Sequence, residues 1–523
     1  MDAFQDTSTQ WTLAVAAAVL CVLYVLSKQF VFRKGNPPPG PRGWWGFMEI
    51  LQANRDDSLY EAAWGWAEKY GDMTFYTVLG QPVCVLNSTD IVRRLFSSDE
   101  YKMLTSDREP NVVSEFAWYN GKELFFTPYN SQTRQKRTLF HKMMGIYGEG
   151  VDKFESVVGK ELDRVLEEMD IARATGQDVP MSQILAKSLK IILYILVNGD
   201  MGSEKVSYDV VDVLERYDTA VNQMLDVQTL TALSFFPALR KFGKYKKLCD
   251  EVRESRADAE KFLFENIKST YEPGKVRGVA DALLHFQGQP GHEWLDNEQI
   301  KGFLAFSFFA GQYSSRFAHM TSRSSLLNIV LTLTHHPEIA RRIQEEIESV
   351  LGDRIPRVED RMSMHYTEAV IIENLRYVSQ LALSSMRTAR EDIHIDGYVI
   401  PKGTQFPVNQ WFFHRDPKIW DDPWKFKPER FLDDKGVVLP ANHPVRKKVQ
   451  AFGIGNRMCP GEAFARSRVF LFVVSILQKF DLLPPENEPL PSCDPRDNLK
   501  GVVRQAPPFK CRLRNRLDEE IKA

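Results

Sequence analysis

Cysteine is sparse in this chain of 523 residues, and its spacing excludes several kinds of site. No two cysteines form a CxxC pair, and none is clustered with others. Disulfide frameworks need dense, paired cysteines, so we interpret these residues as reduced thiols. Zinc and iron–sulfur sites need several clustered ligands and are excluded as well. The six positions are Cys21, Cys84, Cys249, Cys459, Cys493 and Cys511.

Excess charge and internal repeats are absent too. Lys and Arg number 67 against 69 Asp and Glu, a formal net charge of −2, with no long run of one sign. This balance gives no sign of a nucleic-acid partner. No repeat with a period of about 20–50 residues is evident, and no internal linker divides the chain. With 43% hydrophobic residues, the chain can build a large core.

One long hydrophobic run occurs, at residues 11–26, and it can extend to Phe32. At about 1.5 Å per residue, such a run can cross a hydrocarbon core of about 30 Å. Acidic residues precede it and basic residues follow it, which predicts a single-pass anchor with the body in the cytosol. A cleaved signal peptide would carry its basic charge on the other flank. The flanking charges are Asp2, Asp6, Lys28, Arg33 and Lys34.

The segment after this run is rich in proline. GNPPPGPRG, residues 35–43, favours a stiff polyproline spacer that would hold the body at a fixed distance from the membrane. We therefore predict an anchor at 1–34, a hinge at 35–43 and one catalytic domain at 44–523.

The body is predicted to be mainly α with a small β component. Two strands should meet in a hairpin at Gly80-Gln81. A very long helix is expected over 297–334, capped by Asp296 or Asn297 and ended by Pro337. Further helices are predicted at 58–70, in the stretch 149–270, and at 338–351, 365–378 and 460–480, with a strand-rich segment at 393–409.

A glycine-punctuated loop, AFGIGNRMCPGEA at 451–463, holds a single cysteine. Cys459 directly precedes a helix predicted to begin at the next proline, and the N–H groups and dipole there stabilise a thiolate. Gly453 and Gly461 would let the backbone approach something large and flat, and Arg457 could pair with an anion. The residues alone indicate a thiolate ligand on a metal cofactor, with an inert loop cysteine as the alternative.

The whole pattern F-G-x-G-x-R-x-C-x-G, beginning at Phe452, resembles the haem-binding loop of the cytochrome P450 family. Two other family signatures are present in the expected order, ExxR at 373–376 and PERF at 428–431. The resemblance runs from residue 37 onward and is strongest to animal-type microsomal steroid and xenobiotic hydroxylases. It implies the cytochrome P450 fold and haem b as cofactor, with Cys459 as the axial thiolate ligand of the iron.

The same resemblance assigns further residues around the cofactor. Phe452, Gly453, Arg457, Gly461 and Ala310 would line the haem. Glu373, Arg376 and Arg430 would form a buried charge network, although a Glu–Arg pair at this spacing could also lie on a helix surface. Arg134 and Arg387 would contact the haem propionates. The family's tryptophan before the first of these arginines is replaced by Thr133, and its prolines between 376 and 387 are absent.

The expected long helix contains the least typical residues. Ala310 and Gly311 match the family motif, Tyr313 stands at its acid position and Ser314 at its threonine. In a helix, the Ser314 hydroxyl could bond the Ala310 carbonyl and open a bend for dioxygen and water. Ser314 would then pass protons, whereas Tyr313, with a reference pKa of about 10, cannot imitate a carboxylate. Tyr313 either alters proton delivery, or packs against a neighbouring helix, or marks chemistry that needs no dioxygen.

The resemblance implies a monooxygenase that inserts one oxygen atom from O2 into a lipophilic small molecule such as a steroid, terpenoid, fatty acid or xenobiotic. NADPH-cytochrome P450 reductase would supply electrons, with a b-type cytochrome as a second candidate partner, at the endoplasmic reticulum membrane. The basic cluster Arg446, Lys447 and Lys448 would dock such an acidic donor, or is a solvated charge run. An isomerase or dehydratase, and a non-enzymatic haem or lipid binder, are the competing hypotheses.

Overall fold

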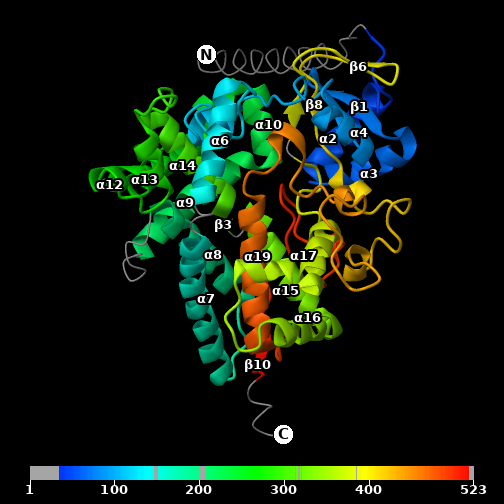
Figure 1. Cartoon of the computed structure of the whole chain (residues 1–523). Coiled ribbons are helices and arrows are strands. Elements are labelled where there is room, and N and C mark those ends of the chain that lie inside the picture. The colour runs from blue at the N-terminus through cyan, green and yellow to red at the C-terminus, as the bar shows by residue number, and fades with distance from the viewer. Residues whose placement is uncertain are drawn as a thin grey trace, which may run out of the picture. The chain divides into compact units, whose positions relative to one another are not determined.

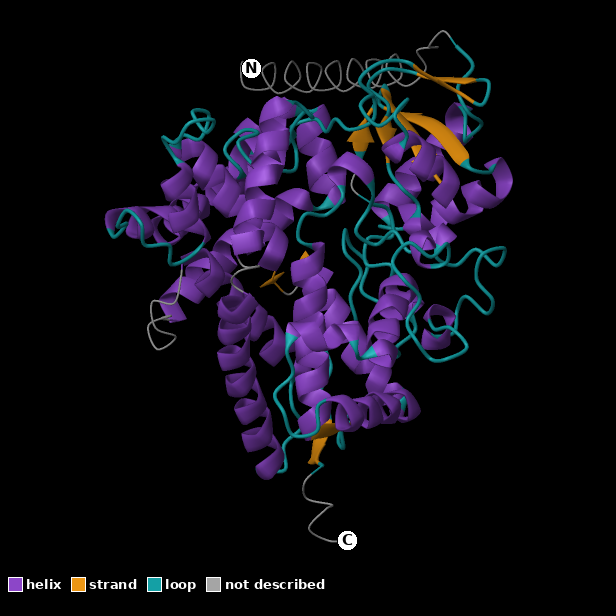
Figure 2. Cartoon of the chain, viewed as in Figure 1, coloured by secondary structure: helices purple, strands orange, loops and turns teal. Residues whose placement is uncertain are grey.

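The computed structural model describes residues 35–146, 151–198, 208–312, 314–315, 318–319, 321–384 and 386–516. Helices predominate and the strands are few and short (Figure 2), which confirms a mainly α fold with a small β component. The chain divides into two compact units. Of the described residues, the first unit contains those up to Asp107 together with those of Ser384–Asn409, and the second contains those of Arg108–Leu383 and those from Gln410 onward.

The first unit is built on a four-stranded sheet in the order β1-β2-β8-β5. β1 and β2 form the predicted antiparallel hairpin, with Val78 opposite Gln81 at its tip. β8 pairs in parallel with β2 and antiparallel with β5, so a segment more than 300 residues later completes the sheet. The strands are β1 Met73–Val78, β2 Gln81–Leu86, β5 Arg387–Thr388 and β8 Gln405–Phe406, and a separate hairpin is formed by β6 Ile393–Ile395 and β7 Tyr398–Ile400.

Three helices complete the first unit. They are α2 Gly43–Arg55, α3 Leu59–Tyr70 and α4 Thr89–Ser97. α2 buries Phe47, Ile50 and Ala53, which recur at helical spacing. α4 begins where the Ser88 hydroxyl accepts a hydrogen bond from the backbone N–H of Asp90.

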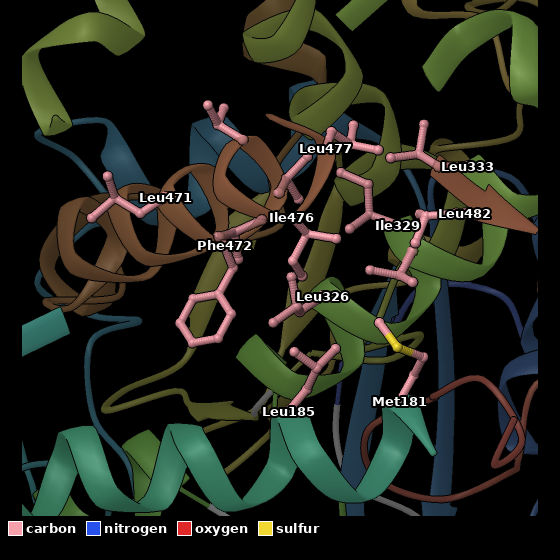
Figure 3. Close-up of a cluster of buried hydrophobic side chains, with 14 of the residues drawn as sticks. Met181, Leu185, Leu326, Ile329, Leu333, Leu471, Phe472, Ile476, Leu477 and Leu482 are labelled. Atoms are coloured by element: carbon pink, nitrogen blue, oxygen red, sulfur yellow. The ribbon is translucent and has the colours of Figure 1, made fainter. Parts of the chain in front are cut away.

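The second unit has a large apolar core where α8, α15 and α19 meet (Figure 3). Leu185 of α8, Leu326 of α15 and Phe472 of α19 lie beside one another there. α16 and α17 pack against α15 and α19 (Figure 1). The helices of this part are α7 Val151–Ala174, α8 Met181–Asn198, α15 Thr321–His335, α16 Pro337–Val350, α17 His365–Val378 and α19 Glu462–Lys479, with the strands β9 Phe480–Leu483 and β10 Arg512–Asn515.

A second apolar cluster in this unit joins α9, α11, α13 and α14 with α5. Phe303, Leu304 and Phe308 of α14 are buried in it. The helices that contribute to it are α5 Val112–Ala117, α6 Ser131–Ile146, α9 Tyr208–Leu225, α10 Val227–Phe235, α11 Gly243–Glu260, α12 Asn266–Ser269, α13 Val279–Phe286 and α14 Asn297–Gln312. The short helix α18 Gln410–Phe413 also belongs to the second unit.

The prediction of one continuous helix over 297–334 was wrong. α14 begins as expected, capped by the Asp296 carboxylate on the Gln299 N–H at 2.7 Å, but it ends at Gln312. Two short strands follow, β3 Ser314–Ser315 and β4 Ala318–His319, before α15 starts. A glycine at 311 and a run of serines favour this break, because glycine disfavours helix and serine hydroxyls compete for backbone groups.

The predicted membrane anchor at 1–34 lies outside the described residues. Within the described ranges, no helix is both long enough and apolar enough to span a bilayer. The boundaries of the anchor, hinge and catalytic domain stay predictions.

Candidate active site

The loop around Cys459 closes on itself just before α19. The Cys459 N–H donates to the Phe452 carbonyl at 2.8 Å. Gly453 and Gly455 have φ values of 68° and 66°, a conformation that glycine adopts without strain. α19 begins at Glu462 rather than at Pro460, because Pro460 and Gly461 form a turn first.

The electrostatic surroundings of the thiol differ from the expectation. Burial raises the pKa of the Cys459 thiol, and this effect outweighs the Gly461 N–H, Arg137 and Arg108, which all lower it. A helix end alone therefore does not make this thiol a free thiolate. A metal ion does so directly, since a coordinating thiol loses its proton.

The loop leaves room for a flat cofactor. A Cβ atom added at Gly453 or at Gly461 would meet no atom within 4 Å. A soft sulfur donor beside open glycine backbone, with cationic side chains close by, suits an iron porphyrin that carries anionic propionates. The residues present thus fit a haem group.

Arg137 of α6 contacts this loop from outside, and Arg457 belongs to it. The Arg137 Nη2 donates to the carbonyl of Met458, the residue before the cysteine, at 2.6 Å. Arg457 is buried and donates to backbone carbonyls of the segment 124–127. Its expected partnership with an anion stays a prediction. Arg137 matches the second basic position of the same family motif as Arg134, but a propionate contact was predicted for Arg134 alone.

Arg134 is exposed on α6 and lines a hollow of about 370 Å³ with Lys142 and His292. Thr133, in place of the family tryptophan, is buried, and its N–H donates at 2.9 Å to Oδ1 of Asn130, which caps the start of α6. Arg387 belongs to the first unit, where it is buried in β5 with its guanidinium 3.8 Å from the centre of the Phe96 ring. The propionate contacts assigned to both arginines stay predictions.

A buried lysine on α6, Lys136, lies beside the buried Glu123 and was not foreseen. The Lys136 Nζ donates to the carbonyl oxygens of Lys122 and Glu123, at 2.8 and 3.1 Å. Burial lowers the pKa of Lys136 to about 8 and raises the pKa of Glu123. The two hydrogen bonds of Lys136 to backbone carbonyls fix α6, and with it Arg137, to the preceding segment.

The charge network behind the loop is confirmed. Glu373 and Arg376 are fully buried on α17 and share two hydrogen bonds of 2.7 Å. The Arg430 Nε lies 3.5 Å from the same carboxylate. The Arg376 guanidinium also donates to the carbonyls of His414 and Pro423, so it links α17 to the chain that leads into the loop.

Arg446 of the basic cluster is engaged by other residues of the protein. Its guanidinium lies 3.7 Å from the Glu368 carboxylate and donates to the Leu439 carbonyl at 2.7 Å. Lys447 beside it is exposed. The docking role of the cluster stays a proposal and rests mainly on the two lysines.

The distal residues lie at the end of α14 and in β3. Ala310 and Gly311 belong to the last turn of α14, and Ser314 pairs with His319 between β3 and β4. β3 packs beside α9. Ser314 is therefore not helical, and the expected helical bond to the Ala310 carbonyl does not apply. Tyr313 lies outside the described residues.

Comparison with known proteins supports the same reading. The family profile of cytochrome P450 matches residues 38–513. Cytochrome P450 1A1 of Canis lupus familiaris is 28% identical over 91% of this chain and 90% of its own length. The steroid 17-alpha-hydroxylase/17,20 lyase of Gallus gallus is 28% identical, covering 89% of this chain and 90% of its own. A solved zebra fish cytochrome P450 with progesterone has a TM-score of 0.73 and 25% identity, over 87% of this chain and 99% of that one.

The chain belongs to the cytochrome P450 family. It is a monooxygenase-type oxidoreductase with the fold of that family, and its cofactor is haem held by a cysteine thiolate.

Proposed function

We propose that this cytochrome P450 inserts one oxygen atom from O2 into a lipophilic small molecule, with Cys459 as the haem ligand. The supporting observation is the closed loop of Cys459 with its open glycine backbone, together with the buried Glu373–Arg376 pair, which is bonded to the chain that leads into the loop. When bound, haem supplies the iron that activates dioxygen, and the thiolate adds electron density for that activation.

The chain's own residues hold and orient the cofactor. Cys459 would supply the thiolate ligand, Phe452 would line the cofactor, and Gly453 and Gly461 leave space beside the cysteine. Arg137, which contacts the loop, and Arg457 within it would provide positive charge for the anionic groups of the cofactor. The Glu373–Arg376 pair fixes the backbone that leads into the loop.

The distal side has to deliver protons, and Ser314 is the residue we assign to this task. Its hydroxyl can both accept and donate a hydrogen bond, so it can pass a proton from ordered water. Gly311 would keep the backbone beside it open. The solved zebra fish relative is described with progesterone, and the Gallus gallus relative is named a steroid hydroxylase. Both support a lipophilic substrate such as a steroid.

The decisive experiment is turnover with reductase, NADPH and isotopically labelled dioxygen, after a binding screen of steroids, terpenoids and fatty acids. One labelled oxygen atom should enter the product for each NADPH oxidised. Product formed without reductant, or product without the label, would rule out the proposal.

Tyr313 at the acid position favours one alternative, a haem-thiolate isomerase or dehydratase that does not use O2. Replacement Tyr313→Asp separates the two. In a monooxygenase with altered proton delivery, the aspartate should lower the peroxide released per NADPH, because a carboxyl group passes protons more readily. Ser314→Ala should raise peroxide release. An isomerase should convert its substrate without NADPH, and neither substitution should change its peroxide release.

We also propose that the protein is held on the endoplasmic reticulum membrane with its catalytic part in the cytosol. The apolar run 11–32 supports this, and so does α2, which starts shortly after it. Trp44, Trp45 and Met48 of α2 are 51%, 84% and 41% exposed, and tryptophan is the residue that favours the membrane interface.

Alkaline carbonate extraction of the full-length protein tests the anchor. The native protein should stay with the membranes, whereas Leu20→Arg with Leu23→Arg should release it. Each central charge costs about 2.5–3.5 kcal/mol of insertion free energy. Extraction of the native protein by carbonate would contradict the anchor.

A further inference from the structure

His414 lies in a buried hydrogen-bond network that leads from the Glu373–Arg376 pair to the start of the Cys459 loop. Its side chain is fully buried, directly after α18. The Arg376 Nη1 donates to the His414 carbonyl at 2.7 Å. This bond fixes the backbone of His414 to α17 and leaves both ring nitrogens available for other hydrogen bonds.

The two ring nitrogens have different roles. The Gln450 N–H donates to Nε2 at 3.2 Å, so Nε2 carries no proton. Nδ1 lies 2.9 Å from Ser379 Oγ, whose single proton is already given to the Arg376 carbonyl. Nδ1 must therefore donate to Ser379, and the network requires the neutral imidazole with its proton on Nδ1.

Gln450 is the point at which the network holds the loop. Its carbonyl accepts the Gln410 Nε2 at 2.9 Å and the Gly453 N–H at 2.8 Å, and its N–H is bound by His414. Two residues further on, the Phe452 carbonyl accepts the Cys459 N–H. Losing the His414 bond would remove one of the bonds that hold the end of the loop from which the cysteine is positioned.

The charges that face His414 among the described residues are cationic. They are Arg376 of α17 and Arg415 beside it, while the Glu373 carboxylate is bound by Arg376 and Arg430. Burial, aided by Arg415 and Arg376, lowers the pKa of His414 well below its ordinary value. No described carboxylate stands ready to stabilise an imidazolium there.

We propose that His414 is a positioning residue that holds the Cys459 loop only while its imidazole is neutral, so that acid releases the loop. A proton on Nε2 would face the Gln450 N–H, donor against donor, and the bond would be lost. The proposal rests on the assignment of Cys459 as haem ligand.

The direction of the pH effect follows from linkage. A released imidazole titrates near its ordinary pKa of about 6.5, whereas the held one resists protonation. Protons therefore bind preferentially to the released state as the pH falls below about 6.5. The equilibrium constant for release of the loop should rise about tenfold for each unit by which the pH falls, until the pH reaches the pKa of the held imidazole.

The test is the carbon monoxide spectrum of the reduced full-length holoprotein, recorded from neutral to acidic pH. In the native protein, the ratio of protein without the thiolate-type band to protein with it should rise about tenfold for each unit by which the pH falls below about 6.5. His414→Gln keeps an acceptor that does not titrate, so the part of this pH dependence that comes from protonation of His414 should be absent. His443→Gln is the matched control, because that imidazole also accepts a backbone N–H, from Val445 at 3.3 Å, but is only half-buried.

Identical profiles for the native protein and His414→Gln would overturn the proposal. If that variant does not assemble, hydrogen exchange of the native holoprotein decides instead. After correction for intrinsic rates, acid should deprotect the Gln450 amide before those of α15, and equal protection throughout would contradict the role. A thiolate-type band that survives Cys459→Ala at neutral pH would refute the ligand assignment, a separate result from a failure of His414.

Discussion

Arg468 places a guanidinium inside the second unit without an ion-pair partner among the described residues. It is 1% exposed, and no described acceptor bonds its Nε or Nη1. The guanidinium carbon lies 4.7 Å from the centre of the Phe464 ring, which is a cation–π contact. Burial lowers the pKa of Arg468 to about 9. A buried charge without a partner costs free energy of folding, so this residue weakens the native state.

Arg468→Met should therefore raise the free energy of unfolding by about 1–4 kcal/mol, since a methionine fills similar space without a charge. Arg376→Met is the comparison, because it leaves the buried Glu373 carboxylate without its partner and should cost about 3–5 kcal/mol. Thermal unfolding of both holoproteins measures the difference. A lower melting temperature for Arg468→Met would show that this charge is compensated in the working protein.

Individual residues were predictable where their partners are close in the sequence. Glu373 and Arg376 are three apart on one helix, so spacing alone could bring them together. Arg137 and His414 could not be assigned in this way, since Arg137 bonds a residue 321 positions later and His414 one 36 positions later. Arg468 was missed because nothing in a sequence marks a charged residue that the fold buries.

At the scale of elements, the loop before α19 depends on backbone conformation more than on side chains. Gly453 and Gly461 both face open space, but only Gly453 has a positive φ, of 68°. Gly461 is the N-cap of α19, with φ of −97°. The two positions therefore separate the effect of backbone strain from the effect of added bulk.

Gly453→Ala should destabilise the holoprotein by about 1–2 kcal/mol, because an L-residue there enters the left-handed region. Gly461→Ala should cost less strain, since alanine adopts its φ readily. Melting temperatures and haem content of the two purified variants give the measurement. If both changes destabilise equally, bulk beside the cofactor and not backbone strain determines the loop.

Element boundaries were predictable where a clear chemical signal exists. Asp296 caps α14 and Pro337 follows the end of α15, as expected. The break between these helices was not expected, because the apolar residues on both sides continue at helical spacing. The start of α19 was placed two residues too early, because a turn at Pro460 and Gly461 precedes the helix.

At the scale of the whole molecule, the mainly helical class was predictable from hydrophobic spacing, but the assembly of the first unit was not. Its sheet takes β5 and β8 from residues 387–406; β8 pairs with β2 of the hairpin at 73–86, and β5 pairs with β8. Asn409 strengthens this join through bonds to the Ala63 carbonyl and to Asn87 Oδ1, at 3.1 and 3.0 Å. No local pattern encodes which distant strands pair.

The account as a whole depends on Cys459 as the thiolate ligand of the haem. The most direct measurement is the carbon monoxide difference spectrum of the reduced full-length protein, with Cys459→Ala compared to Cys493→Ala, a second half-buried free thiol. We predict that Cys459→Ala abolishes the thiolate-type band and that Cys493→Ala keeps it. A thiolate-type band in the Cys459→Ala protein would contradict the account.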